Sequence, residues 1–327
     1  MRNGVLLLNL GSPETLADVR PFLYKLFSDP EIIRIKNPAF RHMLAWIISR
    51  TREKKSQNLY RQIGGGSPLR KITESQAAAL EAVLARRKIP ARVYVGMLCG
   101  KPSIDEAFNN IMADGVRRLT LLPLFPQYSG TTTGACFRYV RTLVGRRKLS
   151  GKIEISFIED WYKNPQYIDA ITEMITAGLE RFAENKRQDV HILYSAHSLP
   201  EKYITEGDPY PDRTRECVSL INDRLAGRLN RCVDYSLAFQ SKIGPVKWLE
   251  PSVESILGVL ARRGVRRILT VPVSFVSDNI ETLYELDIAY RKLASELEVA
   301  EFHRVESLNV HPKFIAALAD IVQNHLD

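Results

Sequence analysis

The chain has 327 residues, of which 45% are hydrophobic, and a formal net charge of +9. The length suggests two domains or one large α/β unit, and the hydrophobic share is that of a soluble protein with a real core, which argues against a disordered or fibrous chain. The charge fits either an anionic partner (nucleic acid, a membrane surface or an acidic small molecule) or a generally basic surface, and no apolar run approaches the roughly 18 residues of a transmembrane helix.

Strand-like and helix-like segments then alternate along the sequence. The predicted strands cover residues 4–10, 91–98, 117–124, 152–158, 190–196, 233–239, 266–273 and 300–304. Predicted helices lie between them, among them 72–88, 103–114, 166–184, 252–263 and 311–326. Because parallel strands must be joined by crossovers, this alternation indicates parallel sheets that are covered by helices on both faces.

The segment between the first two predicted strands carries an apolar, helix-like stretch at residues 40–48, which contains Trp46. Basic residues cluster just after it, at residues 50–55. An apolar helix that bears a tryptophan beside Lys and Arg is typical of an element that rests on a membrane surface. An ordinary core helix followed by a solvated loop has the same pattern, and periodicity alone does not separate the two.

A glycine-rich motif follows, Tyr60-Arg-Gln-Ile-Gly-Gly-Gly-Ser-Pro68. Glycines allow positive φ angles and let a ligand approach the backbone closely. The motif lacks the Gly-Lys-Ser/Thr of a Walker loop, and it does not directly follow a strand, as a dinucleotide-binding fingerprint does. Beside a basic cluster, it suits a ligand that carries carboxylates.

The two halves of the chain resemble each other. The run Gly115–Pro123 matches Gly264–Pro272, and Pro102 matches Pro251, both at an offset of 149 residues (264 − 115 and 251 − 102). The opening strand matches the strand that ends in His197 at an offset of 186, so the first half holds about 37 additional residues (186 − 149). We therefore expect an α/β fold of two similar Rossmann-like lobes, each a parallel sheet flanked by helices, that face each other across a cleft.

The repeat also divides the chain into domains. We expect an N-terminal lobe at residues 1–150, with an inserted lip at about residues 30–68. The C-terminal lobe then covers residues 151–327, and its last helix can pack back on the first lobe.

His197 ends a predicted buried strand of the second lobe, at the edge of a parallel sheet where ligands bind. A lone histidine is more often structural than functional, so its surroundings decide. The segment that contains Asp278 and Glu281 lies just past another strand end of the same lobe and brings carboxylates to that edge. An imidazole in such company can bind a metal or accept a proton near neutral pH.

Taken in order, these motifs resemble those of the ferrochelatase family, whose members insert ferrous iron into a porphyrin. Besides the glycine-rich motif, the matching segments are Phe125–Ser129 with Thr132–Gly134, Ser195–Pro200, Gly207–Tyr210, Gln240–Pro245, Trp248–Leu249, Ser277–Asp278, Glu281–Asp287 and Glu306–Asn309. The resemblance covers nearly the whole chain, and it is specific because several multi-residue motifs coincide.

The resemblance implies roles for individual residues. Metallation must remove two pyrrole protons and deliver a partly dehydrated Fe²⁺, and His197 and Glu281 are implied as the catalytic and metal-binding pair that brackets this step. Asp278 and Glu285 are implied as supporting residues next to this pair. The implied porphyrin-binding residues, among which an arginine can hold a propionate with two hydrogen bonds, are Leu10, Arg52, Lys55, Tyr60, Ser67 and Ser241.

The sequence departs from the family pattern at three places near these residues. Ala289 stands where a third acid often follows Glu285, which weakens the case for a continuous acidic track. Asn279 stands where members can have a histidine, so no second imidazole is available there. The segment Gly96–Cys99 replaces a Gly-x-Arg-Tyr pattern and lacks its basic residue.

Two further positions bear on substrate and cofactor. Coproporphyrin-using relatives tend to have tyrosine at the place of Leu10, so the resemblance favours protoporphyrin IX, with coproporphyrin as the alternative. Gly130 stands where animal-type relatives have a cluster cysteine, and no Cys-rich tail follows Ser307. We expect no [2Fe–2S] cluster and no tightly bound cofactor, and we expect Fe²⁺ as a substrate. A non-catalytic porphyrin or heme carrier remains a second function class, although a carrier needs no acid–imidazole pair.

The expected partners are protoporphyrin IX and Fe²⁺, with the membrane surface as a further candidate. We expect no nucleic-acid partner, because the basic residues lack the interleaved aromatics of a known module. Four cysteines without a C-x-x-C pair fit a reducing cytosol, and the apolar run after Met1 is too short for a signal peptide. The expected location is therefore the cytoplasm, with or without peripheral attachment to a membrane.

Overall fold

The structure is a computed structural model that describes residues 2–244 and 246–326. Pro245, which ends the predicted Gln240–Pro245 motif, lies outside the described residues, as do Met1 and Asp327. The chain forms two compact units. The first comprises the residues up to Trp161 together with those from Ile315 onward, and the second is Tyr162–Phe314.

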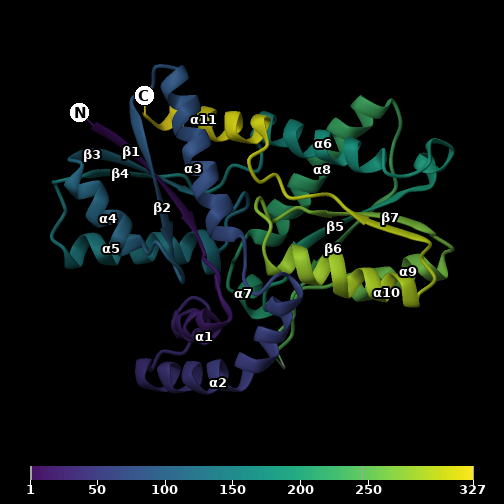
Figure 1. Cartoon of the computed structure of the whole chain (residues 1–327), viewed down its shortest axis with the longest axis horizontal. Helices are drawn as coiled ribbons and strands as arrows, with labels where there is room; N and C mark the ends of the chain where they lie inside the picture. Colours follow the sequence, from purple (N-terminus) through teal and green to yellow (C-terminus); the bar gives the residue numbers. More distant parts are fainter. Residues whose placement is uncertain (1, 245, 327) are drawn as a thin grey trace. The chain divides into compact units, whose positions relative to one another are not determined.

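The first unit is built on a parallel four-stranded sheet in the order β2-β1-β3-β4. Its strands are β1 (Arg2–Asn9), β2 (Ala91–Met97), β3 (Val116–Pro123) and β4 (Glu154–Phe157). Its helices include α3 (Leu69–Arg86), α4 (Ile104–Ala113), α5 (Ala135–Arg146) and α11 (Pro312–Leu326), whose first residues still belong to the second unit. In Figure 1, α4 and α5 lie below this sheet and α3 and α11 above it.

Strand β1 shows why this sheet is buried on both faces. Leu6 and Leu8 pack in one core cluster with α4 and α5. Val5 and Leu7 are equally buried, and because successive strand side chains alternate, they point to the opposite face. A continuous apolar run is the pattern expected of a strand in a parallel sheet.

The second unit repeats this architecture with a parallel sheet in the order β6-β5-β7-β8. The strands are β5 (His191–His197), β6 (Tyr235–Gln240), β7 (Arg267–Pro272) and β8 (Glu301–Arg304). Its helices include α6 (Pro165–Leu179), η3 (Glu184–Asp189), α7 (Glu201–Thr205), α8 (Tyr210–Leu229), α9 (Val253–Arg262) and α10 (Arg291–Glu296). In Figure 1, α6 and α8 lie above this sheet and α9 and α10 below it.

The two sheets share one strand order, which confirms the predicted fold of two similar parallel α/β lobes. In each unit a π-helix follows the third strand: η2 (Gly130–Gly134) in the first and the longer η4 (Glu281–Tyr290) in the second. The ends of the predicted strands agree with the observed ones to within two residues. Apolar runs this regular leave little freedom for other pairings.

The border between the units lies later in the chain than residues 150 and 151. Strand β4 pairs with β3 and so belongs to the first sheet. Beyond it, the indole nitrogen of Trp161 donates to the carbonyl of Pro123 at 2.8 Å, and its backbone nitrogen donates to that of Pro126 at 3.0 Å. These hydrogen bonds fasten the chain to the end of β3 until Trp161, which is why the first unit extends so far.

The additional residues of the first half form η1 (Leu16–Asp18), α1 (Val19–Ser28) and α2 (Pro38–Gln62). Asn37 caps the start of α2: its side-chain oxygen accepts a hydrogen bond from the backbone nitrogen of Phe40 at 3.2 Å, and Pro38 occupies the first turn. The helix then continues through residues 50–55, so the solvated loop expected after a core helix is not present there. Within the described ranges, no helix combines the length and apolarity that crossing a bilayer requires.

Candidate functional site

His197 is the last residue of β5, at the carboxyl edge of the second sheet. Its backbone nitrogen donates to Oγ of Ser274 at 3.0 Å, and its Nδ1 lies 2.6 Å from the carbonyl oxygen of Ser198. Because a carbonyl only accepts hydrogen bonds, Nδ1 carries the proton in this arrangement. In the neutral ring, Nε2 therefore presents a lone pair.

The surroundings of His197 favour that neutral ring. Burial lowers the pKa of its imidazole, while the hydrogen bond to the Ser198 carbonyl and the negative charge of Glu285 act in the opposite direction. The ring of Phe275 lies edge-on, with the two ring centroids 6.2 Å apart. A neutral imidazole is the form that binds a metal or accepts a proton.

Glu281 is the first residue of η4, and Asn279 fixes the start of that helix. The side-chain oxygen of Asn279 accepts hydrogen bonds from the backbone nitrogens of Glu281 at 2.9 Å and of Thr282 at 3.1 Å. Burial raises the pKa of the Glu281 carboxyl. The side chain thus sits where a cation or a proton would lower the cost of its charge.

Glu285 lies four residues further along and is held by the end of β6. Its Oε2 accepts hydrogen bonds from the side-chain nitrogen of Gln240 at 3.0 Å and from the hydroxyl of Ser241 at 2.6 Å. Burial and the negative charge of Glu281 raise its pKa to about 7, although Ser241, His197 and Gln240 act against the shift. Near neutral pH this carboxyl can take up or release a proton with little driving force.

Gln240 contacts both glutamates and lies beside His197, and the sequence analysis did not predict this role. It lies opposite His197 in the register of β5 and β6. The side-chain nitrogen of Gln240 also donates a hydrogen bond to the backbone carbonyl of Glu281 at 3.2 Å, and its side-chain oxygen accepts one from the hydroxyl of Ser195. Its place at a strand end beside His197 was the signal that could have revealed it.

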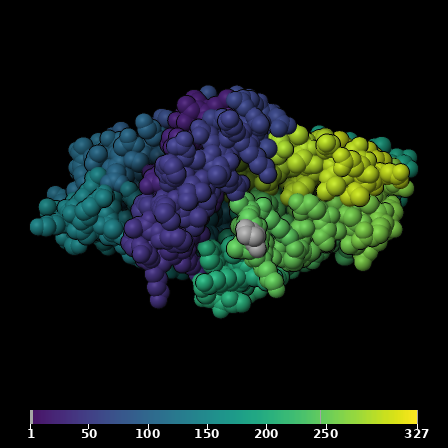
Figure 2. Space-filling view, turned by 90° about the horizontal axis from the view of Figure 1, so that it is seen from below, coloured from purple at the N-terminus to yellow at the C-terminus, as the bar shows by residue number. Residues whose placement is uncertain are grey.

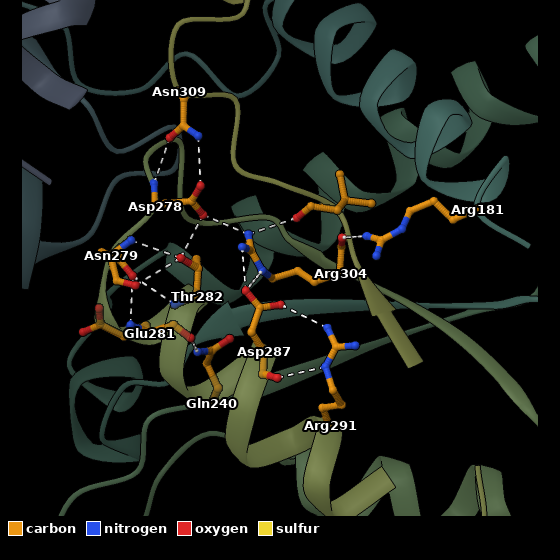
Figure 3. Close-up of polar contacts among 11 residues, drawn as sticks. Arg181, Gln240, Asp278, Asn279, Glu281, Thr282, Asp287, Arg291, Arg304 and Asn309 are labelled. Carbon is orange, nitrogen blue, oxygen red and sulfur yellow. Dashed lines mark hydrogen bonds and ion pairs between the residues drawn. The ribbon is translucent and has the colours of Figure 1, made fainter. Parts of the chain in front are cut away.

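Asp278 has a different environment from the two glutamates. Its carboxylate forms an ion pair with Arg304 at 2.8 Å and accepts hydrogen bonds from Thr282 at 3.0 Å and from Asn309 at 2.9 Å (Figure 3). Burial alone would raise its pKa, but the charge of Arg304 and these hydrogen bonds lower it below the usual range. Asp278 is therefore a fixed anion that braces the segment ahead of Glu281.

The other predicted substrate-binding residues belong to the first unit. Arg52, Lys55 and Tyr60 all lie on α2, where Tyr60 is buried, Arg52 half-buried and Lys55 exposed. Burial lowers the pKa of Arg52, whose guanidinium lies 5.9 Å from the ring centroid of Phe27.

Ser67 and Leu10 complete the set. Ser67 is buried, and its backbone nitrogen donates to the carbonyl of Pro13 at 2.8 Å. Leu10 is half-buried and packs against the first core cluster. The structure thus gathers His197, Ser241, Asp278, Glu281 and Glu285 within the second unit, while the remaining candidates lie in the first. Among residues 2–244 and 246–326, no three or more His, Cys, Asp or Glu side chains are arranged to hold a metal ion.

Comparison with known proteins agrees with the resemblance found in the sequence. A sequence model of the ferrochelatase family matches residues 2–326. A ferrochelatase of Gloeothece citriformis is 48% identical over 99% of this chain and 83% of its own length. One from a Synechococcus species is 48% identical over 99% of this chain and 93% of its own.

Among solved structures, the sirohydrochlorin chelatase SirB from Bacillus subtilis subspecies spizizenii, in complex with cobalt, has a similar fold, with a TM-score of 0.57. The similarity covers 99% of this chain and 95% of that one at 14% identity, which is evidence for the fold alone. The family match and the cyanobacterial relatives carry more: the chain belongs to the ferrochelatase family, the porphyrin metal chelatases.

Proposed function

We propose that this enzyme inserts Fe²⁺ into protoporphyrin IX to give protoheme, the terminal step of heme synthesis. The observation that carries the proposal is the pairing of a neutral imidazole, His197, with a carboxyl whose pKa is about 7, Glu285, beside Glu281. A chelatase must accept two pyrrole protons and release them again, and groups that titrate near neutral pH suit that task.

The chemistry follows from the atoms present. Nε2 of His197 has a lone pair that either accepts a pyrrole proton or binds the incoming iron. Glu281 supplies a half-buried carboxylate that favours a cation nearby. Glu285, next along the helix, takes up protons near pH 7 and passes them on. Fe²⁺ is a substrate in this scheme, and His197 and Glu281 bracket the site where it is inserted into the porphyrin.

The proposed porphyrin-binding residues are those that the family resemblance implies. Arg52 and Lys55 are cations on α2 that suit propionate carboxylates, and Tyr60 and Ser67 add hydroxyls. Leu10 offers an apolar contact, which favours protoporphyrin over the more carboxylated coproporphyrin. Ser241 remains a candidate ring contact, and since its hydroxyl proton is given to Glu285, it would face the ring as an acceptor.

We further propose that α2 touches a membrane surface from the cytoplasmic side, since protoporphyrin is very insoluble in water. Four large apolar side chains on this helix are 43–50% exposed: Phe40, Met43, Trp46 and Ile47. Arg50 lies beside them, with its guanidinium 5.0 Å from the ring centroid of Trp46. Figure 2 shows the surface of this purple to blue-violet segment. An apolar face next to cations suits an anionic lipid surface.

We also propose that the enzyme carries no [2Fe–2S] cluster and no tightly bound cofactor. Gly130 occupies the position of a cluster cysteine in animal-type relatives. All four cysteines are free thiols: Cys99 and Cys136 are buried in one core cluster of the first unit, Cys217 is buried in the second unit, and Cys232 is exposed. The purified protein is expected to lack visible absorbance and to contain no stoichiometric iron or acid-labile sulfide; their presence would refute this.

One assay tests reaction and substrate together. Purified enzyme is mixed anaerobically with Fe²⁺ and equal amounts of protoporphyrin IX and coproporphyrin, and the two heme products are separated and quantified. We expect protoheme to form first and with repeated turnover. Preferential metallation of coproporphyrin would replace the proposed substrate, and stoichiometric porphyrin binding without turnover would favour a carrier instead.

A further inference from the structure

The helix that carries Glu281 and Glu285 has an unusual geometry for its length. Residues Glu281–Tyr290 are π-helical, and the helix then continues into α10. π-helical hydrogen bonds are rare and usually occupy a single turn inside an α-helix. A run of ten residues therefore needs contacts from outside the helix that keep it from relaxing to α-helical geometry.

Arg304 supplies such contacts from the end of β8 (Figure 3). Its side chain is 6% exposed, and its Nη1 lies 2.8 Å from Oδ1 of Asp278. Its Nη2 and Nε lie 2.8 and 3.0 Å from Oδ2 of Asp287. Asp278 precedes the π-helix and Asp287 lies in its second half, so one guanidinium ties both ends of the segment that bears the two glutamates.

The sheet fixes Arg304 in turn. Arg304 is paired with Thr270 in the register of β7 and β8. Its backbone carbonyl oxygen accepts a hydrogen bond from Nη1 of Arg181 at 3.1 Å. A planar guanidinium with five fixed donors can span two carboxylates in this way, whereas a lysine ammonium is one compact charge. The contact therefore transmits the position of a rigid strand to the π-helix.

We propose that Arg304 is a positioning residue for metal insertion: by tying Asp278 to Asp287, it keeps the intervening segment π-helical and so sets Glu281 and Glu285 relative to each other. The inference rests on the proposed function. A change to α-helical geometry alters the number of residues per turn and rotates Glu281 away from its present direction. Catalytic groups tolerate misplacement of only a fraction of an ångström, so the rate is sensitive to such a rotation.

The test compares R304K with R291K. Lysine at 304 keeps the buried positive charge but cannot span both carboxylates. Arg291 is the matched control, because it meets the same Asp287, with its Nη2 3.5 Å from Oδ1, but is 45% exposed. We expect R304K to lower kcat about tenfold or more while KM for the porphyrin stays within about twofold. R291K should remain close to wild type in both constants.

A second readout does not need activity. Amide hydrogen exchange within residues 279–290 should be about tenfold faster or more in R304K than in R291K, while the thermal midpoints of both variants stay near that of wild type. Unchanged kcat and unchanged exchange in folded R304K would overturn the inference. A porphyrin KM that rises in step with a loss of stability would also overturn it, since that pattern indicates a general structural role.

The D287N variant keeps the test decisive if R304K does not fold. Asparagine retains an acceptor for Arg304 but removes the negative charge, so the contact weakens while Asp278 keeps its ion pair with Arg304. We expect the same split between kcat and KM, and faster exchange in residues 279–290; wild-type values would overturn the inference. If wild-type enzyme itself forms no metalloporphyrin, the proposed function fails, while the exchange comparison still judges the tie.

Discussion

The two sheets have the same topology, yet their central strands end differently. Strand β1 leads into Gly11, and β5 ends in His197, its counterpart in the repeat (197 − 186). At Gly11, φ is +88°, and an added Cβ would lie 2.6 Å from the backbone nitrogen of Gly100. The first unit therefore closes this strand end with backbone, where the second unit places an imidazole.

The helices that follow the third strands also carry different side chains at equivalent positions. Glu281 and Glu285 correspond to Thr132 and Cys136 of the first unit (281 − 149 and 285 − 149). Both helices begin with π-helical turns. One scaffold thus occurs twice, but the proposed acid and base stand on only one copy, so the proposed chemistry depends on a few side chains rather than on the architecture.

The largest effect is expected from making the second strand end resemble the first. H197A should lower kcat for heme formation by several powers of ten, on the order of 4 kcal/mol or more, because the lone pair of Nε2 is lost. Anaerobic initial rates measure this. H191A is the control, since His191 begins the same strand and its Nε2 lies 3.0 Å from Oγ of Ser236. A rate for H197A close to that of H191A would show that the comparison assigns the chemistry to the wrong residue.

The next effect concerns the closed end of the first strand. G11A should reduce the free energy of unfolding by about 3 kcal/mol, because its Cβ has no room and its φ is strained. Gly151 is the matched position, with φ of +78° and no described atom within 4 Å of an added Cβ. G151A should therefore cost only about 1 kcal/mol. Urea unfolding compares the two, and equal losses would mean that backbone contact does not explain Gly11.

A smaller effect on stability is expected from Glu285, whose counterpart in the first unit is the neutral Cys136. The folded-state pKa of Glu285 is about 7, above its unfolded value, so the folded state holds the proton more tightly. Its contribution to stability is present below about pH 4.5 and is lost as the pH rises through about 7. E285Q should remove this loss and stabilise the protein at pH 8 by about 1 kcal/mol or more. Urea unfolding at pH 5 and pH 8 tests the sign; a variant less stable than wild type at pH 8 would reverse it.

The smallest effect belongs to the insertion that distinguishes the first half from the second. W46S should weaken binding to vesicles of anionic lipid several-fold, because an exposed apolar side chain is lost from α2. Its thermal midpoint should stay near that of wild type. Tyr235 is a control, since it is 46% exposed on β6. If Y235S and W46S bind vesicles equally well, α2 is not the contact surface.

Different parts of this molecule were open to prediction for different reasons. The apolar runs of β1 and β5 indicate buried strands, and the 149-residue offset reveals the repeat from the order of the residues alone. The continuation of α2 through residues 50–55 was not visible, because exposed Lys and Arg suit a helix surface and a loop equally well.

The site shows the same division. The proposed pair of His197 and Glu281 could be selected from the sequence because His197 ends one predicted strand and Glu281 follows the end of another, at the edge where parallel sheets place ligands. The strand end marks the place of Gln240 beside His197, but not its hydrogen bond to Glu285, which is 45 residues away. The contact of Arg304 with Asp278, 26 residues away, has no sequence signal either. Such contacts are fixed only when strands and helices have packed, and no local pattern marks them.

The hydrogen bond between Nδ1 of His197 and the carbonyl of Ser198 has a consequence for how this site withstands mutation. Many functional histidines depend on a distant carboxylate to select their tautomer, and a single substitution there can disable them. Here the selecting atom is a main-chain oxygen of the adjoining residue, which every amino acid provides. Replacing Ser198 by another residue that fits its buried position should leave the imidazole in the same protonation pattern, so this part of the proposed site does not depend on which side chain stands at position 198.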